Sequence, residues 1–153
     1  MTNLLANMHK AARLSPGQWL DLLRAAIELA YANRRMGSLR VSELALSLGG
    51  PNAQSVPLSL AQSAFVSRVA FAVPRMGSRV PWRADCLVQA MAAQRWLKSA
   101  GLRSEIFIGA RNDGEDGMAA HAWLKVGAEV VTGGDISPYL QFTTAKDIAS
   151  PET

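Results

Sequence analysis

The hydrophobic pattern of this chain changes its period near residue 103. Before that point apolar residues recur every three or four positions, whereas residues 104–109 and 120–126 alternate or carry β-forming side chains. The first period is that of an amphipathic helix and the second that of a half-buried strand. The sequence therefore predicts an α+β fold, in which a helical N-terminal half is followed by a helix packed on a small antiparallel β-sheet.

Local signals set the first helix. Ser15 is suited to the N-cap, Pro16 to the first helical position, and Gln18 completes a capping box. A stripe of apolar residues at helical spacing follows, which we expect to face the core. Its members are Trp19, Leu22, Leu23, Ala26, Ile27, Ala30 and Tyr31.

Breaks in the chain indicate three more helices, over residues 41–48, 57–73 and 85–100. Gly-Gly-Pro at 49–51, Pro74 and Gly101 follow them in turn. Three antiparallel strands are then expected at 104–109, 120–126 and 129–132, with a turn at 127–128. The glycine-rich polar stretch 112–117 is expected to be an exposed loop and a candidate mobile flap near the site.

Length and composition indicate one domain over residues 1–153, with a helical part at 1–80 and the helix and sheet at 81–153. A lone cysteine cannot form an internal disulfide, so a cytoplasmic location is the default expectation. The N-terminus lacks the pattern of a signal peptide, and the longest apolar stretch contains Gln62 and Arg68, so no membrane segment is expected.

Charge divides unevenly along the chain. Residues 1–83 hold ten Lys and Arg against three Asp and Glu, whereas residues 84–153 hold six against nine. The basic half indicates either an acidic partner or an ordinary solvated helix surface, because its charges are scattered. The absence of a Lys/Arg cluster with interleaved aromatic residues argues against nucleic acid as the partner.

Three residues suggest thiol chemistry. Cys86 is expected in the first turn of the helix at 85–100, where free backbone N–H groups favour a thiolate. His121 is expected on a strand and Asp135 after two glycines, in the order of a nucleophile, a base and an orienting carboxylate. Each also has a structural interpretation: an inert buried cysteine, a packed strand histidine and a turn aspartate.

The face of His121 can be predicted from strand alternation. Trp123 lies two residues on, so both side chains share a face, which we expect to pack against the helix that bears Cys86. A two-residue turn at 127–128 would pair His121 with Gly134 and turn Asp135 away. We therefore predict either a three-residue turn at 127–129 or a bulge at 133–134, which would place Asp135 opposite His121.

Other site features are weaker. Trp82, just before Cys86, and Trp123 are candidate walls of a substrate-binding cleft, although plain core packing is the favoured interpretation for each. Trp19 and Trp96 are expected to pack. One cysteine and two histidines cannot supply a structural zinc site, and no phosphate-binding glycine motif is present. No cofactor or metal is therefore expected.

A set of short elements resembles one family. They are Asp-Cys-Leu at 85–87, Leu-x-x-x-Gly-Leu at 97–102, the strand 105–109 ending in Ile-Gly, and Ala-His-Ala-Trp at 120–123. The chain resembles, best over residues 82–135, the transglutaminase-like leader peptidases of lasso-peptide biosynthesis. That resemblance implies a cysteine peptidase that cleaves the leader from a ribosomally made precursor peptide.

The resemblance also implies roles and partners. Cys86 matches the nucleophile, His121 the base and Asp135 the orienting carboxylate, with Asp147 in reserve for the third role. No strand-rich domain precedes the helices, so a separate leader-recognition protein is expected, with the ATP-dependent macrolactam cyclase as a further candidate partner. Two other functions stay open: a transglutaminase-like enzyme that passes the acyl group to an amine or hydrolyses a side-chain amide, and a non-catalytic adaptor that binds precursor or cyclase.

Overall fold

The computed structural model describes residues 14–37, 57–114 and 117–143. Three helices, α2 (Pro16–Met36), α4 (Leu60–Gly77) and α5 (Cys86–Ser99), precede four strands, β1 (Glu105–Asn112), β2 (Met118–Val126), β3 (Glu129–Thr132) and β4 (Leu140–Thr143). The strands form one antiparallel sheet in the order β3-β2-β1-β4. The predicted α+β fold is confirmed, and β4 is a strand that the sequence pattern did not predict. The helix predicted at 41–48 lies outside the described residues.

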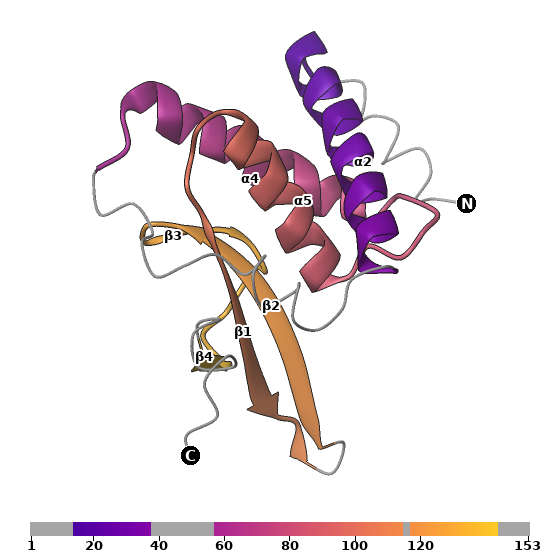
Figure 1. Ribbon diagram of the computed structural model, residues 1–153, viewed down its shortest axis with the longest axis vertical. Coiled ribbons are helices and arrows are strands. Elements are labelled where there is room, and N and C mark those ends of the chain that lie inside the picture. Colours follow the sequence, from indigo (N-terminus) through magenta and orange to yellow (C-terminus); the bar gives the residue numbers. More distant parts are fainter. Residues whose placement is uncertain (1–13, 38–56, 115–116, 144–153) are drawn as a thin grey trace.

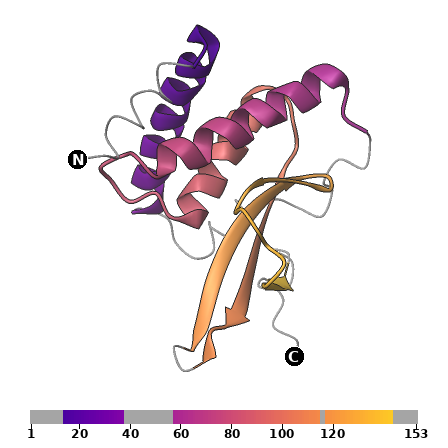
Figure 2. The same cartoon turned by 180° about the vertical axis from the view of Figure 1, so that it is seen from behind.

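The molecule has a helical layer and a sheet layer (Figures 1 and 2). Helix α5 lies between them, because it contacts β1, β2 and β3 as well as α2 and α4. Helix α2 packs on α4 and α5, on the side away from the sheet (Figure 1). The β1–β2 hairpin extends well beyond the helices, so only its end near β3 is covered by them (Figures 1 and 2).

Two capping boxes begin the first two described helices. Ser15 and Gln18 exchange backbone N–H to side-chain hydrogen bonds at the start of α2, as predicted, and Ser59 and Gln62 do the same for α4. The second box starts α4 three residues later than the pattern suggested. The same helix continues past Pro74 to Gly77, because a proline in the last turn removes only one backbone hydrogen bond.

One hydrophobic core joins the two layers. The helices contribute small and branched residues that pack closely, and the sheet contributes the side chains that point toward α5. The sheet residues in this core are Ile106, Leu124, Val126 and Val131. Trp96 of α5 is among the buried helical residues, as predicted.

The apolar stripe predicted to bury α2 was largely wrong. Leu22 is buried, but Trp19, Leu23, Ile27 and Tyr31 are exposed. The buried face of α2 instead holds Leu22, Ala25, Leu29 and Ala32 together with two carboxylates, Asp21 and Glu28. Helix α2 is apolar on two opposite sectors, and the apolar period by itself cannot tell which of them faces the core.

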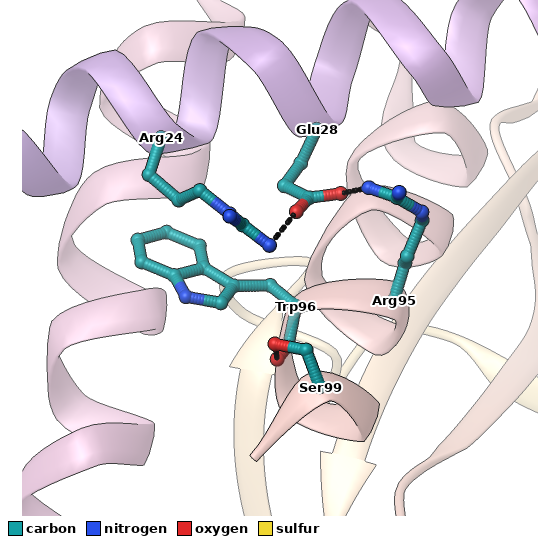
Figure 3. A network of polar contacts seen from close by, with 5 residues as sticks. All are labelled: Arg24, Glu28, Arg95, Trp96 and Ser99. Carbon is teal, nitrogen blue, oxygen red and sulfur yellow. Dashed lines mark hydrogen bonds and ion pairs between the residues drawn. The ribbon is translucent and has the colours of Figure 1, made fainter.

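Ion pairs explain why carboxylates lie on the buried face. Glu28 is fully buried and is paired with Arg24 of the same helix at 2.7 Å and with Arg95 of α5 (Figure 3). Asp21 receives two hydrogen bonds from Arg68 of α4, at 2.6 and 2.9 Å. Each buried carboxylate therefore ties α2 to a different neighbouring helix.

Candidate active site

Cys86 begins α5, as predicted, and is half-buried. The N-cap is Asp85, whose carboxylate accepts a hydrogen bond from Val88 N–H at 3.1 Å and whose carbonyl accepts one from Gln89 N–H at 2.9 Å. The amides of the first two helical residues, Cys86 and Leu87, have no acceptor within the helix. They are donors placed beside the thiol, suited to an anionic oxygen.

The capping carboxylate is itself paired. Arg83 Nε donates to the second oxygen of Asp85 at 2.6 Å, and the arginine is mostly exposed. This cation offsets the negative charge that the cap brings next to Cys86. The helix start thus combines a thiol, free amides and a carboxylate whose two oxygens are both engaged.

Trp82 supplies an unpaired donor just upstream. Its side chain is partly exposed, but the indole Nε1 is buried and finds no hydrogen-bond partner in the part of the chain that the structure describes. Buried N–H groups in folded proteins nearly always have a partner, so an unpaired one calls for an explanation. A ligand oxygen bound near Cys86 would be such a partner.

His121 lies on β2 with its ring held on two sides. Its Nε2 is 2.7 Å from the carbonyl oxygen of Gly133, and its ring stacks on Tyr139 with centroids 4.6 Å apart. A carbonyl oxygen only accepts, so Nε2 carries the proton and donates. In the neutral ring Nδ1 is then the basic nitrogen.

Gly133 is required where it lies. Its φ is +112°, and a Cβ added there would come within 2.4 Å of Trp123 Cβ and 3.4 Å of His121 Nε2. Trp123 is only 2% exposed, and its ring stacks on Phe107 at 6.1 Å. Of the two interpretations of Trp123, cleft wall or packed residue, the structure supports the second: Trp123 is buried and packs beside His121.

The prediction that His121 faces the helix bearing Cys86 was wrong. Leu124 and Val126 of β2 join the core with α5, and alternation turns His121 and Trp123 to the opposite face of the sheet. On that face they meet Tyr139, which precedes β4. Among the described residues, His121 makes no hydrogen bond to Cys86; its ring nitrogen Nε2 bonds the Gly133 carbonyl.

The β2–β3 hairpin has an irregularity, though at neither predicted position. The turn at 127–128 has two residues, because Val126 pairs with Glu129, so the three-residue alternative was wrong. The register then shifts, since Lys125 pairs with Val130 but Leu124 with Thr132. The extra residue is at 131, two positions before the predicted bulge.

Asp135 has another partner in the structure. Its carboxylate accepts a hydrogen bond from Ser137 N–H at 3.0 Å. Hydrogen bonds from the Ser137 side chain and backbone hold the pKa of Asp135 below its usual value. The nitrogen that a triad carboxylate would bind, His121 Nε2, is taken by the Gly133 carbonyl. Asp147 lies outside the described residues.

Residues 22–146 match the transglutaminase-like superfamily, in its Transglut_core3 form. The chain belongs to this superfamily. The match spans the predicted nucleophile and base, and it fits three helices followed by an antiparallel sheet. No curated protein and no solved structure was found to match the chain.

Superfamily membership indicates a cysteine peptidase or acyltransferase type of activity. Cys86 is the only cysteine in the sequence. Within the described ranges no group of three or more His, Cys, Asp or Glu is placed to hold a metal ion. None of the described helices is both long and apolar enough to cross a membrane.

Sequence reasoning missed two residues around His121. Tyr139 stands in a short irregular segment between β3 and β4, where no period indicates its direction. Gly133 was predicted as a turn or bulge residue, yet its carbonyl is the hydrogen-bond acceptor of His121. Two glycines directly after a strand were the only sequence signal for this close approach.

Proposed function

We propose that this protein is a cysteine peptidase that removes the leader from a ribosomally made lasso-peptide precursor, with Cys86 as nucleophile and His121 as base. The observation that carries the proposal is the position of Cys86, in the first turn of a helix packed on an antiparallel sheet, in a chain of the transglutaminase-like superfamily. The substrate class rests on the sequence elements at 85–87, 97–102, 105–109 and 120–123.

The proposed reaction has two stages. Cys86 Sγ attacks the carbonyl carbon at the leader–core junction, its proton passes to His121, and His121 returns that proton to the departing amine as the C–N bond breaks. A thioester joins the leader to Cys86. Water then attacks this thioester, His121 takes the proton of the water, and the products are a leader carboxylate and the restored thiol.

Donors for the tetrahedral oxyanion come from the helix start. The N–H groups of Cys86 and Leu87 have no helical acceptor, and the buried Trp82 Nε1 has no partner among the described residues. A negative oxygen formed on the carbon bonded to Cys86 would satisfy these donors.

The proposal requires His121 to approach Cys86. In the described conformation its Nε2 is bound to Gly133 and its ring lies on the sheet face away from α5. We propose that this is the resting arrangement of the free protein, and that substrate binding changes the backbone around His121 by more than the usual tightening of catalytic hydrogen bonds. Asp135, proposed as the orienting carboxylate, would likewise have to leave Ser137.

Partners are part of the proposal. We propose a separate leader-recognition protein that delivers the precursor, and a cyclase that uses the amine released by cleavage. The decisive experiment incubates a matched precursor peptide with this protein, with and without the leader-recognition protein, and follows the products by mass spectrometry. Wild type is compared with Cys86→Ala and with Ser99→Ala, a control in the last turn of the same helix.

We expect cleavage at one junction by wild type and Ser99→Ala, and none by Cys86→Ala. Cleavage that persists in Cys86→Ala would defeat the nucleophile assignment. A leader product heavier than the hydrolysed leader by the mass of an amine less one water would assign acyl transfer, the second activity that the superfamily supports. No cleavage with any partner would make the protein a non-catalytic adaptor.

A further inference from the structure

Helix α2 exposes a continuous apolar surface that the proposed reaction does not use. Five large side chains form it, with exposed fractions from 44% for Tyr31 to 67% for Leu20. We call this surface the α2 stripe; its members are Trp19, Leu20, Leu23, Ile27 and Tyr31. At about 100° per residue they occupy about 120° of the helix circumference, directly opposite the buried face.

Among the described residues, α2 is held to its neighbours mainly without using the α2 stripe. The other side of α2 buries Leu22, Ala25 and Leu29, and the ion pairs of Asp21 and Glu28 tie it to α4 and α5. A helix anchored in this way gains nothing by leaving five large apolar side chains in water. Exposed apolar patches of this kind mark interaction sites, and Trp and Tyr are frequent anchors in them.

The charges around the stripe are positive. Arg24 lies at its edge, and the guanidinium of Arg95 lies over the Tyr31 ring at 4.0 Å; both also pair with the single buried carboxylate of Glu28. Arg34 lies at its C-terminal end. The acidic residues of α2 are Asp21 and Glu28, and both are buried. The stripe therefore offers apolar side chains and cations, and no exposed carboxylate from its own helix.

We propose that the α2 stripe is the docking surface for an amphipathic helix of a partner protein whose apolar face is bordered by Asp and Glu. An extended straight apolar strip on a helix fits another helix better than it fits a small molecule. Carboxylates on the partner would meet the arginine edge. A second copy of this chain would offer arginines there instead. The proposal stands independently of the proposed peptidase activity.

The test uses two synthetic helical peptides with the same apolar face. One carries glutamates beside its leucines and the other carries lysines in the same places, and each is labelled for fluorescence anisotropy. The protein is tested as wild type, Leu23→Ser, Ile27→Ser and Leu60→Ser. Leu60 is 92% exposed on α4, outside the stripe, and serves as the control. Circular dichroism checks that each variant is folded.

We expect the glutamate peptide to bind wild type at least tenfold more tightly than the lysine peptide, and this difference to shrink as salt is raised. Leu23→Ser and Ile27→Ser should each weaken binding about tenfold, and Leu60→Ser should not. Equal binding of the two peptides, or no binding of either, would overturn the proposal. A wild-type dimer that Leu23→Ser dissociates in sedimentation would also overturn it and assign the stripe to a second copy.

Discussion

At the scale of single residues, Gly133 is the position where backbone and site are most tightly coupled. Its carbonyl accepts from His121, its φ is +112°, and the place of a Cβ is filled by Trp123. Gly134 follows with φ +64° and open space around the same position. Both positions have a backbone conformation that disfavours other residues, but only Gly133 has no room for a side chain. Substitutions at the two positions therefore distinguish backbone strain from a steric clash.

We predict that Gly133→Ala destabilises the fold more than Gly134→Ala does. Both variants suffer the strain of a left-handed residue, roughly 1–2 kcal/mol, and only Gly133→Ala adds an overpacking cost of about 1–3 kcal/mol. Urea unfolding of the two variants measures the difference. Equal losses would show that the Trp123 contact is easily relieved.

Trp82 gives a prediction that separates catalysis from stability. Trp82→Phe removes the unpaired indole N–H and keeps most of the apolar ring, so unfolding free energy should change by less than about 1 kcal/mol. If the indole binds the oxyanion, kcat should fall by about 10²-fold with little change in KM. Trp96→Phe, a buried helix residue, is the matched control for ring size. An unchanged kcat in Trp82→Phe would remove the indole from the mechanism.

Asp135 is expected to titrate below its usual range because of Ser137. The lowered pKa means that this contact contributes stability above about pH 4, which is lost as pH falls through the pKa of the folded state. Ser137→Ala removes the hydroxyl hydrogen bond and keeps the backbone N–H. We predict that it raises the pKa of Asp135 toward the ordinary value, measured by NMR titration of the carboxyl carbon. An unchanged titration would show that the hydroxyl does not contribute.

At the scale of elements, the buried carboxylate of Glu28 joins two helices. Arg24 and Arg95 approach it from α2 and α5, and each arginine is about half exposed (Figure 3). Removing one arginine leaves Glu28 with the other. Removing both leaves a buried carboxylate without a cation, which costs about 3–5 kcal/mol.

We therefore predict that Arg24→Ala and Arg95→Ala are non-additive. The double variant should be destabilised by more than the sum of the two single variants, as measured by urea unfolding. Adding Glu28→Gln to the double variant should recover part of the loss, because no buried charge then remains. Additive losses would mean that water reaches Glu28 once the side chains are gone.

The elements also show what the sequence could and could not predict. Capping residues determined where α2 and α5 begin, because a cap acts on neighbours three residues away. The apolar period correctly predicted that α2 is a helix but did not predict which of its faces is buried, since Leu22 is buried and Leu23 is exposed. The face with Asp21 and Glu28 is paired with Arg68 and Arg95, which come from distant parts of the chain.

The candidate site, too, could be predicted only in part from the sequence. Cys86 could be placed from a helix start alone, whereas the surroundings of His121 depend on the register of β3. A shift of one residue at position 131 changes which backbone group meets the imidazole, and no local pattern signals it. Tyr139, which follows β3, stacks on His121, and no sequence pattern predicts this contact.

At the scale of the whole molecule, the sheet separates the two residues proposed to act together. Cys86 begins the helix that covers one face, and His121 belongs to the aromatic cluster with Trp123 and Tyr139 on the other. If this describes the free protein, His121 should not influence the thiol before substrate binds. Cys86 is the only cysteine, so its alkylation by iodoacetamide reports on the thiol alone.

We predict that His121→Gln leaves the alkylation rate of Cys86 in the free protein within about twofold of wild type, yet lowers peptide cleavage by several orders of magnitude. The two measurements disagree because alkylation samples the resting arrangement and cleavage needs the base beside the thiol. Arg83→Gln removes the cation that pairs with the capping carboxylate of Asp85, so the negative charge beside the thiol is no longer offset and alkylation should slow. This variant is the positive control for electrostatics at the helix start. A tenfold slower alkylation in His121→Gln would show that the base already contacts Cys86 in the free protein, and the resting arrangement proposed for His121 would have to be given up.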